Sequence, residues 1–142
     1  MELMLEKKVA YVLKNMGIRQ ELLGYRYAKY AIELILQDES ILNAITRRLY
    51  PAVAEKFNTT PSRAERAIRH SIESAFDHAD PDMIQEIFGN TISIDLGKAT
   101  NSHFLAVASE LVRFIELPDT AYSIQDTFGK FVANNKGGYV NA

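Results

Sequence analysis

Hydrophobic residues recur along this chain every three or four positions, which is the spacing of amphipathic helices. The apolar positions of residues 3–16 fall on one side of a helix that ends at Gly17, and a wider apolar stripe predicts a helix over about 20–37. The same spacing predicts further helices over 41–49, 51–57, 61–79, 81–88 and 100–116. The stretch "TISI" at 91–94 has the composition of a few extended residues, too few for a sheet. The predicted fold class is all-α, a compact multi-helix bundle.

Polar residues and prolines predict where these helices begin and end. Ser40 can cap the segment that starts at Ile41, and Pro51 is tolerated in the first turn of the next helix. Asn58 is expected to adopt the left-handed conformation that turns the chain sharply. Thr60 can cap the helix that Pro61 starts, and Asp80 and Pro81 repeat this arrangement.

The helix over 61–79 is divided into two faces. On a helical wheel its small and apolar residues share one direction: Ala64, Ala67, Ile68, Ser71, Ile72, Ala75 and Ala79. The opposite half carries Ser62, Arg63, Arg66, Arg69, His70 and Glu73, and Glu65 lies on the flank. The small residues Ala64 and Ala67 allow a second helix to approach closely, and the helix over 51–57, with Val53, Ala54 and Phe57 turned inward, is the expected partner.

Positive charge is concentrated in the same part of the chain. The 142 residues carry a formal net charge of −2, yet residues 47–70 hold six basic side chains against two acidic ones. A local anion-binding surface would have this distribution, and so would an ordinary solvated helix face.

Two helices joined by a tight turn, the second exposing polar residues from its first turns, form the helix-turn-helix pattern of DNA-binding proteins. Arginine reads guanine in the major groove, so Arg63, Arg66 and Arg69 are candidates for base contacts. Glu65 could accept from a cytosine amino group or orient a neighbouring arginine. Phosphates could be bound by Lys56, Thr59, Ser62 and the amino end of the second helix.

The run "LYPAVAEKFNTTPSRAERAIRHSIESAF" closely resembles the DNA-binding domain of the stage-zero sporulation response regulator, the master switch of endospore-forming bacteria. The similarity extends upstream through "MGIRQELLGYRYAKYAIELILQDESILNAITRRLYP" and downstream to "IFGNTIS" and "KATNSHFLAVASELVR". It covers roughly residues 4–115. The resemblance implies an all-helical domain whose recognition helix enters the major groove of a short promoter box, and transcription control through the RNA polymerase sigma factor.

The resemblance also assigns residues. It implies that Arg63, Glu65, Arg66, Arg69 and His70 face the DNA, and that Lys98, Asn101 and Ser102 touch backbone phosphates. The sigma-factor surface it implies lies just after the recognition helix: Asp82, Met83, Gln85, Glu86 and Ile92. A single recognition helix should bind weakly, so a homodimer or tandem boxes would be needed for promoter occupancy.

Two departures from the family pattern affect the expected organisation. The family's domain follows a phosphoaccepting receiver domain, and no strand–helix alternation precedes residue 20 here. Residues 117–142 have no counterpart in the pattern, although Ser123 can cap a short helix over 123–133. We therefore expect a helical DNA-binding domain over 1–116 and an extension over 117–142 that packs on it rather than serving as a partner-binding arm.

Other functional classes fit the sequence less well. The absence of cysteine excludes a disulfide framework, and without a signal peptide or an apolar span we expect a cytoplasmic protein that does not enter the membrane. His70, Glu73 and Asp77 have ligand-like spacing but lie on a single helix face, so we expect neither a metal site, nor a cofactor, nor enzyme activity. Tyr27 and Tyr30 are expected to pack on the core rather than to stack on RNA. The remaining alternative is an interaction module that binds sigma factor or a full-length regulator without binding DNA.

Overall fold

The first two helices bury their apolar stripes against a common interior. The computed structural model describes residues 2–78, 80–88 and 100–117. Helix α1, Glu2–Asn15, buries Val9, Val12 and Leu13 completely. The chain then turns at Gly17, whose φ of 92° is in the left-handed region, and α2 follows over Leu23–Gln37. The helix predicted over 20–37 therefore starts at Leu23, three residues later than predicted.

Between α2 and α3 the chain forms a 3₁₀ helix, η1 (Glu39–Ala44), and a π-helical turn, η2 (Ile45–Leu49). The prediction of one short helix over 41–49, capped by Ser40, was wrong. The cap is Asp38, whose Oδ1 accepts from the Ser40 amide at 3.0 Å and from its hydroxyl at 2.6 Å. Its Oδ2 pairs with Arg48 at 2.9 Å, so one carboxylate binds both ends of the segment. The pKa of the Asp38 carboxyl is lowered, mainly because it accepts a hydrogen bond from the Ser40 hydroxyl and secondly because it accepts one from Arg48.

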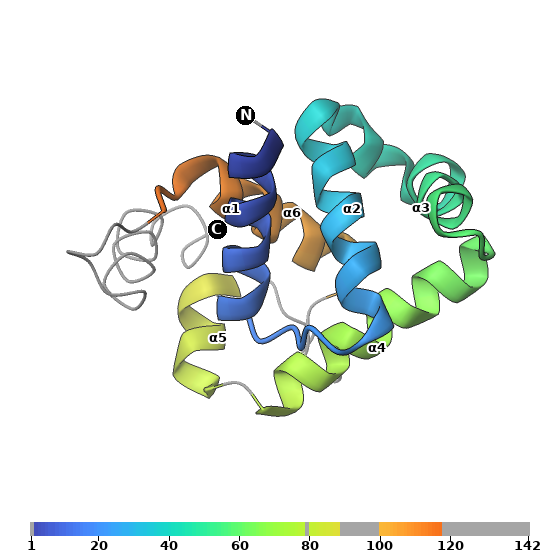
Figure 1. Ribbon diagram of the computed structural model, residues 1–142. Coiled ribbons are helices and arrows are strands. Elements are labelled where there is room, and N and C mark those ends of the chain that lie inside the picture. Colours follow the sequence, from blue (N-terminus) through green and yellow to red (C-terminus); the bar gives the residue numbers. More distant parts are fainter. Residues whose placement is uncertain (1, 79, 89–99, 118–142) are drawn as a thin grey trace.

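Helix α3, Tyr50–Phe57, continues directly from η2, with Pro51 in its first turn as predicted. Helix α4, Pro61–His78, is the longest in the described part of the chain and runs beneath α2 (Figure 1). Helix α5, Pro81–Phe88, starts after Asp80, whose Oδ1 accepts from the Asp82 amide at 3.0 Å, as predicted for a capping aspartate. Thr100 caps α6, Asn101–Phe114, by accepting from the His103 amide.

Four of the helices supply large side chains that are fully buried. Leu13 of α1, Ile32 of α2, Ile68 of α4 and Phe104 of α6 are all fully buried, and each contributes about 1.5–3 kcal/mol by leaving water. The predicted all-α bundle is confirmed for the described residues. The stretch at 91–94, Ala79, and the extension from residue 118 onward, including the predicted helix over 123–133, lie outside them.

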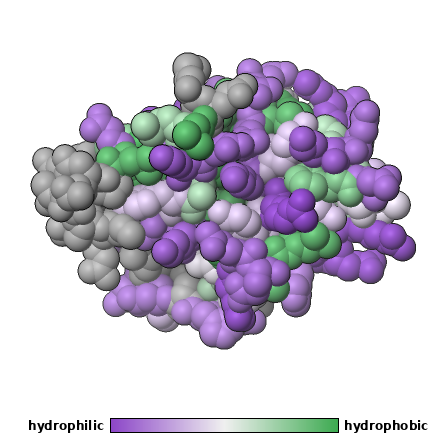
Figure 2. Space-filling view, in the orientation of Figure 1, coloured by the Kyte–Doolittle hydropathy of each residue, from purple (hydrophilic) through white to green (hydrophobic). Residues whose placement is uncertain are grey.

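The tyrosines of α2 pack inward, which confirms the prediction for Tyr27 and Tyr30. Tyr27 is buried and its ring lies 5.0 Å from that of Phe57, centroid to centroid, while Tyr30 meets Phe57 edge-on at 5.9 Å. These contacts connect α2 to the end of α3. The molecular surface in the same orientation is mostly hydrophilic, interrupted by apolar patches (Figure 2). Leu3, Met4 and Leu23 are among the large hydrophobic side chains that stay exposed.

Candidate nucleic-acid interface

A three-residue turn joins α3 and α4 and sets the angle between them. Asn58 adopts the left-handed conformation predicted for it, with φ 53°, and Thr59 donates its amide to the Ala54 carbonyl at 2.9 Å. Thr60 then accepts from the Arg63 amide through Oγ1 at 3.2 Å and caps α4, also as predicted. Because Val53 and Ala64 are fully buried, the two helices pack closely and form a helix-turn-helix.

The two predicted faces of α4 are present. Ala64, Ile68, Ser71, Ile72 and Ala75 are buried, and Ala67 is half-buried. The residues predicted to face DNA lie together on the outer side: Ser62, Arg63, Arg66, Arg69 and His70 are exposed, with Glu65 half-buried on the flank. Tertiary packing thus turns the apolar face inward and leaves the arginines in solvent.

The three arginines differ in their partners. Arg69 Nη1 lies 3.3 Å from Glu65 Oε1, one turn earlier, and Arg69 Nε lies 3.9 Å from Glu73 Oε1, one turn later. Nearly half of the Arg69 side chain remains exposed. Within the described ranges, neither Arg63 nor Arg66 forms an ion pair. These two guanidinium groups are therefore available to an anionic partner, and the third is held in orientation by its carboxylates.

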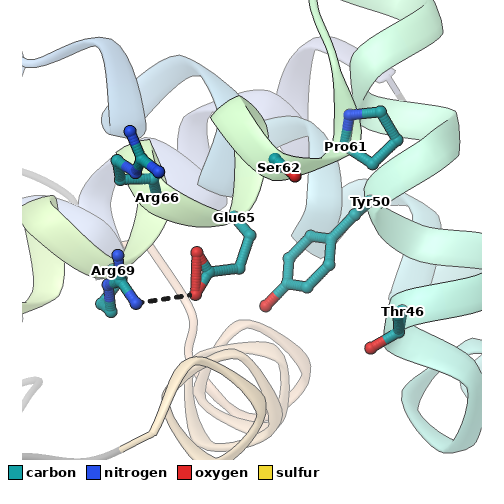
Figure 3. A pocket seen from close by; sticks show the side chains of 7 residues that line it. All are labelled: Thr46, Tyr50, Pro61, Ser62, Glu65, Arg66 and Arg69. Carbon is teal, nitrogen blue, oxygen red and sulfur yellow. Dashed lines mark ion pairs between the residues drawn. The ribbon is translucent and has the colours of Figure 1, made fainter.

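A hollow of about 320 Å³ opens beside the first turns of α4 (Figure 3). Its walls are formed by Thr46, Tyr50, Pro61, Ser62, Glu65, Arg66 and Arg69. The Glu65 side chain lies between Tyr50 and Arg69, and its carboxylate is directed toward Arg69 (Figure 3). Burial raises the pKa of the Tyr50 phenol above its usual value of 10.0, so the hydroxyl keeps its proton at neutral pH. Two guanidinium groups and three hydroxyls supply hydrogen-bond donors to this hollow, against a single carboxylate.

Thr46 and Tyr50 were not identified from the sequence as lining residues. They are four positions apart, one helical turn, which is a signal that could have paired them. That signal was obscured because the chain passes from the π turn η2 into α3 between the two residues. Arg47 and Arg48, the two basic residues just before α3, are both exposed, and Arg48 pairs with Asp38.

The predicted phosphate contacts are spread around the helix-turn-helix. Lys56 is exposed at the end of α3, with Nζ 5.6 Å from the centroid of the Tyr30 ring, and Thr59 is half-buried in the turn. Arg26 of α2 lies nearby, 5.3 Å above the ring of Phe57. Ser102 is exposed in the first turn of α6, and Lys98 lies outside the described residues.

Asn101 is oriented differently from what its predicted phosphate contact would suggest. Its Nδ2 donates to the Tyr50 hydroxyl at 3.0 Å and to the Glu65 carbonyl at 3.2 Å. The side chain thus points into the junction of α3, α4 and α6 and is half-buried there.

Of the predicted sigma-factor surface, Asp82, Gln85 and Glu86 are exposed on α5. The side chain of Met83 and all of Ile92 fall outside the described part of the chain. Among the helices that the structure describes, none has the length and apolar character needed to cross a membrane.

Residues 9–112 match the family described as sporulation initiation factor Spo0A C terminal. The match covers well over half of the 142 residues and includes α2, α3, α4 and α5 entirely. It is a family of DNA-binding transcription-factor domains and not of enzymes. The chain, with its helix-turn-helix and its arginine-bearing α4, therefore belongs to the Spo0A C-terminal family of DNA-binding domains that regulate sporulation genes.

Proposed function

We propose that this domain binds DNA sequence-specifically, with α4 as the recognition helix in the major groove of a short promoter box. The observation that carries the proposal is that Arg63 and Arg66 are exposed, without ion pairs among the described residues, on the first turns of a capped helix. Guanidinium groups in this position can reach the O6 and N7 acceptors of guanine.

The other side chains of this surface have complementary roles. Glu65 and Arg69 form an ion pair in which the carboxylate can accept hydrogen bonds from base edges and the guanidinium can donate them. His70, the next residue, is exposed on the same face of α4. Lys56, Thr59, Ser62 and Ser102 would contact backbone phosphates, which fix the register of the domain on the duplex without reading sequence. Lys98 would belong to the same group.

A monomer presents one recognition helix and so contacts only one box. We expect tight promoter occupancy to require two copies on tandem boxes, because a single small module buries little DNA surface. The exposed polar residues Asp82, Gln85 and Glu86 of α5 are a suitable surface for contact with the RNA polymerase sigma factor.

The test is a fluorescence anisotropy titration of the domain against a duplex with the family's promoter box and against the same duplex with the box scrambled. Wild type should prefer the cognate duplex. Arg66→Ala should lose about 1–3 kcal/mol on the cognate duplex and little on the scrambled one. Arg19→Ala is a matched control, because Arg19 is exposed and lies in the turn before α2, outside the hollow.

The outcomes separate the two candidate functions. Equal losses of affinity on both duplexes would show that Arg66 does not read bases. A wild-type domain that binds neither duplex but binds sigma factor or a full-length regulator would instead support the protein-interaction role.

A further inference from the structure

The amide of Asn101 joins α6 to both α3 and α4, which lie much earlier in the sequence. From the first turn of α6 it donates to the Tyr50 hydroxyl, 51 positions away, and to the Glu65 main chain, 36 positions away. The first acceptor begins α3 and the second lies in α4. This link therefore holds both helices of the helix-turn-helix against α6.

The chemistry of the acceptors fixes the orientation of the amide. A backbone carbonyl only accepts hydrogen bonds, so the atom facing the Glu65 carbonyl must be the nitrogen of Asn101 and not its oxygen. An amide nitrogen has two hydrogens, and both are engaged, one by Tyr50 and one by Glu65. No side-chain donor of Asn101 is left for a phosphate.

Each acceptor belongs to the proposed DNA-binding surface. The ring of Tyr50 forms a wall of the hollow beside Arg66, and its oxygen accepts from Asn101, so its own proton points elsewhere. Glu65 is fixed at its carbonyl by Asn101 while its carboxylate pairs with Arg69. A shift of the Glu65 main chain would therefore displace the arginine that its side chain orients.

We propose that Asn101 is a positioning residue for sequence readout, which sets α4 and Tyr50 relative to α6 and does not itself contact phosphate. This inference rests on the proposed function of α4. It predicts that removing the amide lowers the preference for the cognate sequence and leaves the sequence-independent, salt-dependent affinity unchanged. A phosphate contact would show the opposite behaviour, with equal losses on every duplex and a smaller salt slope.

The experiment compares three single variants of the full chain, and the double variant Asn101→Ala/Tyr50→Phe, with wild type on the cognate and scrambled duplexes. Asn101→Ala removes the link, and Tyr50→Phe removes only the oxygen that accepts from Asn101. Ser102→Ala is the matched control, because Ser102 is the next residue, is exposed, and is a predicted phosphate contact. Circular dichroism melts establish the temperature at which all variants are folded. If Asn101→Ala does not fold, Tyr50→Phe still tests the link, because it keeps the buried ring and removes only the hydroxyl.

We expect Asn101→Ala to lower the cognate-to-scrambled affinity ratio about fivefold, which is on the scale of the net contribution of a hydrogen bond. Tyr50→Phe should lower it in the same direction, and the double variant should lose no more than Asn101→Ala alone, since the two groups act through one link. Ser102→Ala should leave the ratio unchanged.

A second readout does not depend on DNA. Amide hydrogen exchange in α4 around residues 65–69 should accelerate in Asn101→Ala and not in Ser102→Ala. If wild type does not discriminate between the duplexes, the proposed function fails, and this exchange measurement alone decides whether Asn101 positions α4. Unchanged exchange, or equal loss of affinity on both duplexes with a reduced salt slope, would overturn the inference.

Discussion

Arg69 lies between two carboxylates of its own helix, with Nη1 3.3 Å from Glu65 Oε1 and Nε 3.9 Å from Glu73 Oε1. Both pairs are partly exposed, so they add little to stability. Their main consequence is orientation, because a guanidinium held at two points along the helix axis has less freedom to meet an arbitrary phosphate. Glu65 also places a negative charge in a surface that otherwise suits DNA.

We expect Glu65→Gln to make DNA binding tighter and less selective. Loss of the carboxylate removes repulsion from phosphates and releases Arg69. Affinity for a scrambled duplex should rise about two- to fivefold, on the scale of an exposed charge interaction, while the cognate-to-scrambled ratio should fall. Anisotropy titrations on both duplexes measure this change. Glu6→Gln on the exposed side of α1 is the control for net charge, and a ratio unaltered by Glu65→Gln would show that the ion pair does not orient Arg69.

Lys56 is expected to contribute affinity without selectivity. Its ammonium group is exposed beside the Tyr30 ring at the end of α3, where it can reach a phosphate. Lys56→Gln should weaken binding to all duplexes alike and reduce the slope of log affinity against log salt by about 1. Titrations at several salt concentrations give the slope, with Lys7→Gln on α1 as the control. A loss confined to the cognate duplex would instead assign Lys56 to base reading.

Gly24 is expected to be required for the crossing of α2 and α4. A Cβ at this position would overlap the Ser71 hydroxyl and the Ala67 carbonyl, whose carbon would be 2.8 Å away. Gly24→Ala should therefore destabilise the domain by about 1–3 kcal/mol through overpacking, although the same change in an exposed helix stabilises. Chemical denaturation measures the difference.

The sign of the Gly24→Ala effect is itself diagnostic. A stabilised variant would show that the helices separate without loss of packing. Combining Gly24→Ala with Ser71→Gly should restore only part of the stability, because the Ala67 carbonyl belongs to the backbone and remains in place.

His103 is expected to make stability depend on pH in a mildly acidic range. It packs edge-on against Phe88, with ring centroids 5.5 Å apart, and burial lowers its pKa below the usual 6.5. The fold thus favours the neutral ring, so the contribution to stability is complete above pH 6.5 and is lost as the pH falls through the lower pKa of the folded state.

Denaturation at a series of pH values from 7.5 to about 5 tests this expectation. His103→Gln should remove the decrease in unfolding free energy over this range, and His78→Gln, at an exposed position, should retain it. The pKa values of Asp38 and Glu21 are lowered from 3.8 and 4.5, so their contribution to stability is lost only at a pH below this range and does not obscure the effect. Identical pH profiles for wild type and His103→Gln would contradict the assignment.

The sequence by itself determined the parts of this protein that depend on neighbouring residues. Helix periodicity, the left-handed Asn58, and the caps at Thr60 and Asp80 were all predicted correctly, because each is set by interactions within one or two helical turns. The separation of α4 into a buried and an exposed face followed from the same periodicity. The motif around the arginines was also enough to identify the family, which the match over residues 9–112 confirms.

Only the tertiary structure decided which residues from different helices meet. Asp38 binds Arg48 ten positions away, and Asn101 reaches Tyr50 and Glu65 at the junction of three helices. Neither contact has a periodic signature, since the chain between the partners can take many paths and the packing of whole helices fixes where its ends lie. Local sequence specifies each helix and its polar face, and the packing of helices against one another specifies which polar groups remain free to bind a partner.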